Sequence, residues 1–149
     1  FAQISTPLAS NSLEGCSILL VEDEPSIQEA MRQTLVEYGA RVQTASTAQD
    51  ALDTLRAEPH VDVLVSDIGL PGMDGYELLS RIRTDLALDA GRLPAIAVSA
   101  FARAEDRTRA LAAGFQRYVT KPYNVGQLVA AILDSRLDGI EPPDASRVG

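Results

Sequence analysis

The sequence is poor in cysteine, histidine and aromatic residues. It contains one cysteine, one histidine and no tryptophan, and aromatic residues make up 5% of the 149 residues. A single cysteine allows no internal disulfide, which suits a reducing compartment. Cys16 comes just before an apolar run, so we expect a small buried packing residue rather than a reactive thiol. His60 follows a proline in a stretch that reads as a loop, so we expect it to be a loop residue without a catalytic role.

Long apolar runs and an excess of positive charge are also missing. No run approaches the ~20 apolar residues that span a bilayer, and the start of the chain lacks the basic and apolar regions of a signal peptide. The formal net charge of −8 argues against non-specific binding to nucleic acid or to an anionic membrane. We therefore expect a cytoplasmic protein with no nucleic-acid partner and no membrane contact of its own.

The length fits one domain between two polar ends. Residues 1–14 begin with a Ser, Thr and Pro-containing stretch that is typical of a linker. Residues 15–138 carry the apolar periodicity of a folded domain, and residues 139–149, with Pro142 and Pro143, are expected to form a disordered tail. The chain begins with Phe1 rather than Met, so we expect it to be a piece of a longer protein.

Five short strand-like segments alternate with five segments of helical periodicity. The expected helices begin near capping residues such as Thr47, Asp74 and Asn124, and we expect the side chain of Glu77 to reach back to the start of its helix. The expected strands are residues 17–21, 41–45, 61–66, 95–98 and 116–120, and the alanine-rich fourth helix is residues 104–113. This alternation predicts an α/β fold with a parallel sheet that is covered by helices on both faces.

Acidic residues follow two of the expected strands. The apolar run of residues 61–66 ends in Asp67, and the run of residues 17–21 ends in Glu22, Asp23 and Glu24. Ligands of parallel α/β sheets bind at the carboxyl ends of the strands. If the two strands are neighbours, Glu22, Asp23 and Asp67 meet at one edge, where a hard divalent cation relieves their repulsion. Glu24 fits the start of the following helix better.

Two further strand ends carry polar side chains. Residues 95–98 lead into Ser99, and residues 116–120 lead into Lys121 and Pro122. In chain order the strand ends therefore carry an acidic pair, a lone aspartate, a hydroxyl and a Lys-Pro dipeptide. This set resembles the receiver domain of two-component response regulators, and the resemblance covers about residues 16–138.

The resemblance implies a doubly wound, flavodoxin-like sheet of five strands in the order 2-1-3-4-5. It implies that Asp67 is the phosphoacceptor and that Mg²⁺ is the cofactor. Asp23 and Asp67 would be direct metal ligands, Gly69 would offer its backbone carbonyl, and Glu22 would act chiefly through metal-bound water. Many members of the family have Asp at the position of Glu22, which is one methylene longer.

The resemblance also assigns roles around the phosphoryl group. Ser99 would donate its hydroxyl to a phosphoryl oxygen, and Lys121 would place a cation where the new charge appears. The Lys121–Pro122 peptide is similar to the cis bond of the family. Tyr118 stands at the aromatic switch position, whose ring moves inward when the hydroxyl residue, here Ser99, is drawn toward the phosphoryl group.

The implied function is that of a phosphoprotein in phosphorelay signalling rather than a free-standing enzyme. A phosphoryl group would come from the phosphohistidine of a histidine kinase or a histidine phosphotransfer domain. Phosphorylation would then alter the face formed by the fourth helix, fifth strand and fifth helix, which also allows a homodimer. The linker-like start favours the terminal receiver of a hybrid sensor histidine kinase as the parent.

Three other functions stay open at this point. A phosphatase with an aspartyl nucleophile typically has a second Asp two residues later, where this chain has Gly69. A calcium-binding loop at residues 67–77 would need Asp or Asn where Gly69 and Pro71 stand. A pseudo-receiver that only binds partners is disfavoured by the presence of Asp67, Ser99 and Lys121.

Overall fold

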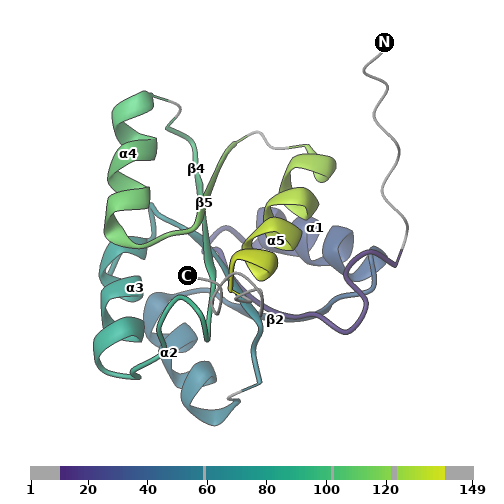
Figure 1. Ribbon diagram of the computed structural model, residues 1–149, viewed down its shortest axis with the longest axis horizontal. Coiled ribbons are helices and arrows are strands. Elements are labelled where there is room, and N and C mark those ends of the chain that lie inside the picture. The colour runs from purple at the N-terminus through teal and green to yellow at the C-terminus, as the bar shows by residue number, and fades with distance from the viewer. Residues whose placement is uncertain (1–10, 59, 102, 122–123, 140–149) are drawn as a thin grey trace, which may run out of the picture.

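The computed structural model describes residues 11–58, 60–101, 103–121 and 124–139. Within these residues five parallel strands form one sheet in the order β2-β1-β3-β4-β5, and helices lie on both of its sides (Figure 1). This confirms the flavodoxin-like topology. The strands are β1 (Ser17–Val21), β2 (Arg41–Ala45), β3 (Val63–Asp67), β4 (Ala95–Ser99) and β5 (Arg117–Thr120). The helices are α1 (Pro25–Glu37), α2 (Ala48–Ala57), α3 (Gly75–Thr84), α4 (Ala104–Ala113) and α5 (Val125–Gly139).

The sheet separates two apolar cores. Alternate residues of β1 point to opposite faces, so Leu19 belongs to the core under α2, α3 and α4, whereas Leu20 belongs to the core under α1 and α5. Strands β3 and β4 are likewise buried on both sides. Burial on both faces explains why the sequences of β1, β3 and β4 are apolar runs without a polar side. Strand ends therefore provide the polar chemistry of the domain.

The expected helix caps are confirmed, with one correction. The side chains of Thr47, Asp74 and Asn124 each accept a hydrogen bond from a backbone N–H in the first turn of α2, α3 and α5. The side chain of Glu77 does not reach back to the start of α3. Its Oε2 instead lies 2.9 Å from a guanidinium nitrogen of Arg81, one turn along the helix, where a charged donor is available.

Two strands end one residue later than expected, so the residues at their ends belong to the sheet. β3 begins at Val63 rather than Val61 and includes Asp67, and β4 extends to Ser99. Asp67 is paired with Val98, while Ser99 is paired with Thr120. The backbone of Asp67 and of Ser99 is thus held by strand pairing in the sheet.

The start of the described chain packs against the domain. Leu13, within the segment expected as linker, is fully buried, and its N–H donates to the carbonyl of Tyr38 at 2.8 Å. Cys16 is buried as expected, and burial raises the pKa of its thiol to about 11. The rest of the expected linker up to residue 10, the tail from residue 140, and Pro122 of the expected cis peptide lie outside the described residues. No helix in the described ranges has the length and apolar character to cross a membrane.

Candidate functional site

Three carboxylates meet at the carboxyl ends of β1 and β3. The two strands are neighbours, with Val21 opposite Ser66, so Glu22 and Asp23 after β1 lie beside Asp67 at the end of β3. One carboxylate oxygen from each acid lies within 4.8 Å of the others. Glu22 is buried, with 2% of its surface exposed, Asp67 is half-buried and Asp23 is exposed. The sequence prediction that these acids converge is confirmed.

Lys121 bridges two of these acids. Its Nζ lies 3.0 Å from Oε1 of Glu22 and 3.0 Å from Oδ2 of Asp67. The backbone N–H of Lys121 donates to the carbonyl of Ser99 at 2.7 Å, which holds the end of β5 against β4. Burial lowers the pKa of the ammonium group, but its hydrogen bonds to Asp67 and Glu22 outweigh burial and raise that pKa above its usual range. The ammonium therefore remains charged at neutral pH.

The other oxygens of the two bridged acids accept backbone hydrogen bonds. Oε2 of Glu22 accepts from the N–H of Glu24 at 3.1 Å, and Oδ1 of Asp67 accepts from the N–H of Gly69 at 2.9 Å. Glu24 itself caps α1 through the N–H of Ser26, as expected for an acid outside the cluster. These contacts fix the side chains of Glu22 and Asp67 before any ligand arrives.

The donor set fits a hard divalent cation. Among the described residues, the ammonium of Lys121 pairs with Glu22 and Asp67, two of the three carboxylates, so the cluster keeps an excess of negative charge. Magnesium binds oxygen ligands, keeps several waters and needs only one or two protein carboxylates. Asp23 and Asp67 would hold it, with Glu22 close enough to reach it directly or through water. The composition of this acidic cluster is therefore suited to Mg²⁺.

A chain of hydrogen bonds leads from Ser99 to Tyr118. Oγ of Ser99 accepts from the N–H of Phe101 at 3.1 Å, and the carbonyl of Phe101 accepts from the hydroxyl of Tyr118. The ring of Tyr118 is buried, with 6% of its surface exposed, and the guanidinium of Arg107 lies 5.6 Å from the ring centre. Ser99 and Tyr118, which the sequence proposed as a pair, are thus linked through Phe101.

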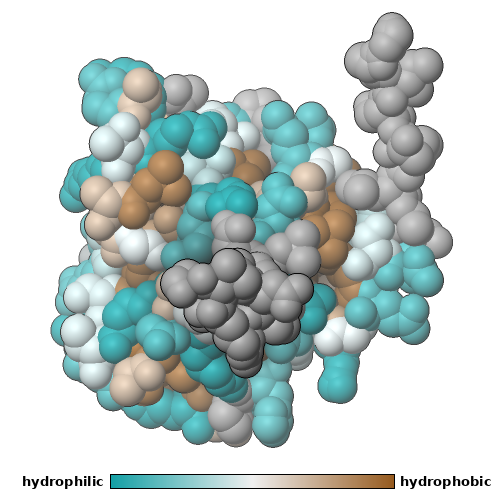
Figure 2. Space-filling model, in the orientation of Figure 1, coloured by the Kyte–Doolittle hydropathy of each residue, from teal (hydrophilic) through white to brown (hydrophobic). Residues whose placement is uncertain are grey.

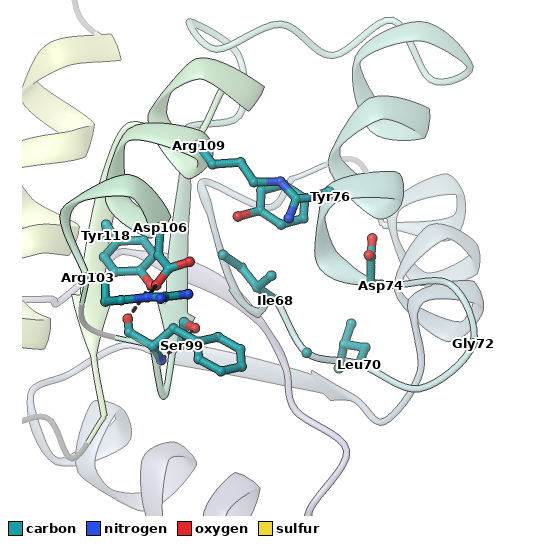
Figure 3. Close-up of a pocket in the computed structure, with 12 residues that line it drawn as sticks. Ile68, Leu70, Gly72, Asp74, Tyr76, Ser99, Arg103, Asp106, Arg109 and Tyr118 are labelled. Carbon is teal, nitrogen blue, oxygen red and sulfur yellow. Dashed lines mark hydrogen bonds and ion pairs between the residues drawn. The ribbon is translucent and has the colours of Figure 1, made fainter.

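An open pocket of about 470 Å³ lies between α4 and the loop that follows β3 (Figure 3). On one side of it Ser99, Arg103 and Tyr118 gather, and on the other the loop runs from Ile68 toward Asp74. At its far end the guanidinium of Arg109 lies 4.2 Å from the ring centre of Tyr76, which connects α4 to α3. Sequence reasoning missed this contact, because no local pattern links two residues of different helices.

The model of the response regulator receiver domain matches residues 18–133. This match extends over most of the described chain and includes every strand end that carries a polar group. The chain belongs to the response regulator receiver domain family. Two-component signalling is therefore the process in which this receiver domain takes part.

The curated relatives of the receiver domain include proteins of very different length. An uncharacterised 14.6 kDa protein of Leptolyngbya boryana is 42% identical over 135 residues, which are 90% of this chain and 98% of the relative. The transcriptional regulatory protein KdpE of Mycobacterium tuberculosis is 37% identical over 77% of this chain and 48% of its own length. The sensor histidine kinase RcsC of Escherichia coli is 37% identical over 79% of this chain and 12% of its own length. The chain thus corresponds to one part of the longer relatives.

Solved structures agree with the fold. A CheY-like receiver domain protein from Methanospirillum hungatei superposes with a TM-score of 0.73 at 31% identity, covering 83% of this chain and 95% of that chain. A response regulator from Chloroflexus aurantiacus reaches a TM-score of 0.75 at 26% identity, over 82% of this chain and 98% of that chain. Nearly the whole of each neighbour is therefore matched by the described sheet and helices.

Proposed function

We propose that this receiver domain accepts a phosphoryl group on Asp67 and acts as a phosphorylation switch. The observation that carries the proposal is the position of Lys121, whose ammonium lies 3.0 Å from Oδ2 of Asp67 inside a cluster of three carboxylates. Phosphoryl transfer depends mainly on positioning and on neutralising charge. The fixed position of the Asp67 carboxylate supports the first requirement. The ammonium of Lys121, and a metal ion held beside Glu22 and Asp23, would meet the second.

The phosphodonor is a phosphohistidine of a histidine kinase or histidine phosphotransfer domain. A carboxylate oxygen of Asp67 attacks the phosphorus, the P–O bond forms as the P–N bond breaks, and the electron pair of that bond stays on the departing imidazole nitrogen. The ammonium of Lys121 pairs with the phosphoryl oxygens, and the hydroxyl of Ser99 donates to one of them. Asp23, Asp67, Glu22 and the carbonyl of Gly69 would hold Mg²⁺, which would supply positive charge beside the phosphoryl group.

Phosphorylation is read out through Tyr118. Movement of Ser99 toward the phosphoryl group would pull on the N–H of Phe101, whose carbonyl accepts the hydroxyl of Tyr118. Displacement of Phe101 would weaken that hydrogen bond and alter the packing of Arg107 on the tyrosine ring. A local change at Asp67 would thereby bias the position of α4.

The surface that responds is formed by α4, β5 and α5. A groove of about 350 Å³ lies on it, lined among others by Arg107, Arg117, Gln127 and Asp134. Its mixed charges suit a polar protein partner or a second copy of the domain. Over the face shown in Figure 2, apolar residues are scattered among hydrophilic ones, which suits contacts that form and dissociate.

We propose that the receiver domain, residues 15–138 of this chain, is one domain of a hybrid sensor histidine kinase. Support comes from the match to part of a sensor histidine kinase in Escherichia coli. The cytoplasm is the proposed location, because a buried single cysteine suits a reducing compartment. The match to nearly the whole of a 14.6 kDa protein supports a single-domain regulator as the second candidate.

Incubation with acetyl phosphate and Mg²⁺ tests the proposal. Intact-mass measurement should detect one added phosphoryl group in the natural protein. No adduct should form when a metal chelator is present during the incubation. Asp67→Asn should give no adduct while keeping the fold. An adduct of equal yield on Asp67→Asn would contradict the role of Asp67, and the absence of both adduct and Mg²⁺ binding at millimolar concentration would favour a pseudo-receiver.

A further inference from the structure

We propose that Gly75 is a positioning residue for Asp67, because the backbone that carries the phosphoacceptor packs directly on its Cα. The proposal rests on the proposed phosphoryl transfer to Asp67. Gly75 lies eight positions after Asp67, in the first turn of α3. As a glycine it has no side chain that could contact a ligand. Its role would be to leave room for the end of β3.

The approach at Gly75 is too close for any other residue. A Cβ at this position would lie 2.7 Å from the carbonyl oxygen of Asp67 and 2.8 Å from Cα of Ile68. Both are backbone atoms, so no rotation of a side chain would relieve the overlap. The N–H of Gly75 also donates to the carbonyl of Ile68 at 2.9 Å, which closes the loop after β3 onto the start of α3.

Neither side of this contact can move freely. The N–H of Ile68 donates to the carbonyl of Val98 at 3.1 Å, and the carbonyl of Asp67 accepts from the hydroxyl of Ser66 at 2.9 Å. On the other side the side chain of Asp74 caps α3, and Leu78 and Leu79 anchor that helix in the core. Figure 3 shows this loop along one side of the pocket. A methyl group at Gly75 would therefore strain both segments and displace the backbone of Asp67 along with the start of α3.

Such a shift would be costly for transfer. Oδ2 of Asp67 lies 3.0 Å from Lys121 and its Oδ1 lies 2.9 Å from the N–H of Gly69, so small movements change both contacts. Displacement of a reacting group by about 1 Å can slow a reaction by about 100-fold. Intrinsic helix propensity works in the opposite direction, because alanine is favoured over glycine within a helix. Loss of activity on Gly75→Ala would therefore come from the contact with Asp67.

Other glycines in the described chain supply matched controls. A Cβ at Gly126, in the first turn of α5, would lie 3.5 Å from Oδ1 of Asn124, which is ordinary van der Waals contact. Gly126→Ala thus repeats the change from glycine to alanine near a helix start without touching the end of β3. A Cβ at Gly69 would meet Oδ1 of Asp67 at 3.7 Å, so the close approach belongs to Gly75 rather than to the whole loop.

The experiment compares the natural protein, Gly75→Ala and Gly126→Ala with acetyl phosphate as the donor. At saturating donor and Mg²⁺, the rate constant of Gly75→Ala should fall by about 10-fold to 100-fold, with amide shifts in its NMR spectrum centred on residues 67–69. Gly126→Ala should stay within about twofold of the natural protein. A saturated rate for Gly75→Ala equal to that of Gly126→Ala would overturn the proposal, as would a loss confined to donor affinity.

A second measurement uses the natural protein alone and covers the case in which Gly75→Ala does not fold. If Gly75 and Asp67 are coupled, a ligand that fixes Asp67 must also stabilise the contact at Gly75. Beryllofluoride with Mg²⁺, a phosphoryl mimic, should slow hydrogen exchange of the Gly75 amide by about tenfold or more, well beyond any effect on Gly126. Unchanged exchange at Gly75 in the loaded protein would overturn the proposal. Failure of the natural protein itself to become phosphorylated would instead count against the proposed function.

Discussion

The ammonium of Lys121 and the carboxylate of Asp67 face each other at 3.0 Å, although 53 residues separate them in the chain. The contact exists because β3 and β5 flank β4, with Asp67 paired to Val98 and the N–H of Lys121 bonded to the carbonyl of Ser99. Two strand ends that are distant in sequence thus place a carboxylate and an ammonium group together. The first two predictions below test side chains around this pair.

Replacing Lys121 by methionine should slow phosphorylation by acetyl phosphate by about 10-fold to 1,000-fold, because the cation facing the phosphoryl oxygens is lost. Mg²⁺ should bind more tightly to this variant, since the acids lose the ammonium that partly neutralises them. Single-turnover kinetics and a fluorescence or calorimetric Mg²⁺ titration measure the two effects. Lys121→Arg keeps the charge and serves as control; a full rate for Lys121→Met would exclude the role given to the ammonium.

Replacing Asp23 by asparagine should stabilise the metal-free protein and weaken its binding of Mg²⁺. Asp23 is exposed and lies in a cluster of three carboxylates whose oxygens are within 4.8 Å of one another, so removing one charge relieves repulsion. We expect an increase in the free energy of unfolding of about 1 kcal/mol, measured in urea without metal, and about a tenfold rise in Kd for Mg²⁺. Asp53→Asn, on the exposed side of α2, is the control. Unchanged metal affinity would argue against Asp23 as a ligand.

Replacing Tyr118 by phenylalanine should interrupt the response of α4 while leaving phosphorylation of Asp67 nearly unchanged. The substitution removes only the hydroxyl that donates to the carbonyl of Phe101. Amide chemical shifts of residues 104–113 should change on addition of beryllofluoride and Mg²⁺ in the natural protein and change much less in the variant. Equal shifts in both proteins would mean that the hydroxyl has no part in the switch.

Cys16 should contribute a characteristic pH dependence to stability. Burial raises the pKa of its thiol from 9.0 to about 11, so the folded state keeps the proton more strongly than the unfolded state. The resulting stabilisation is present below pH 9 and is lost as the pH rises toward 11, by at most about 1.4 kcal/mol per pH unit. Urea unfolding of the natural protein and of Cys16→Ala across this window measures the difference. Parallel pH profiles for the two proteins would show that the thiol is not protected by folding.

Much of the site could be predicted from the sequence because the ends of the buried strands can be recognised in it. The apolar runs stop abruptly at Glu22, Asp67 and Ser99, and parallel strands bring their carboxyl ends to one edge. Alternation of strands and helices indicates parallel crossovers but leaves the order of the strands open. That order came from the resemblance to receiver domains, and the sheet confirms it.

The rest could not be predicted because it depends on packing between distant segments. Gly75 follows a helix cap, where glycine is unremarkable, and only the folded loop brings the carbonyl of Asp67 against it. The contact of Arg109 with Tyr76 joins two helices that have no common pattern. The expectation that the side chain of Glu77 reaches back to the start of α3 was wrong for a related reason. The capping pattern takes no account of Arg81, which pairs with Glu77 instead.

The most direct test of the central claim is transfer from a radiolabelled phosphohistidine protein to this chain. The label should move to the natural protein in the presence of Mg²⁺, be released by hydroxylamine as expected for an acyl phosphate, and map to the peptide that contains Asp67. Asp67→Asn, folded to the same extent, should remain unlabelled. Label that appears on Asp67→Asn, or that maps to a different residue of the natural protein, would contradict the account.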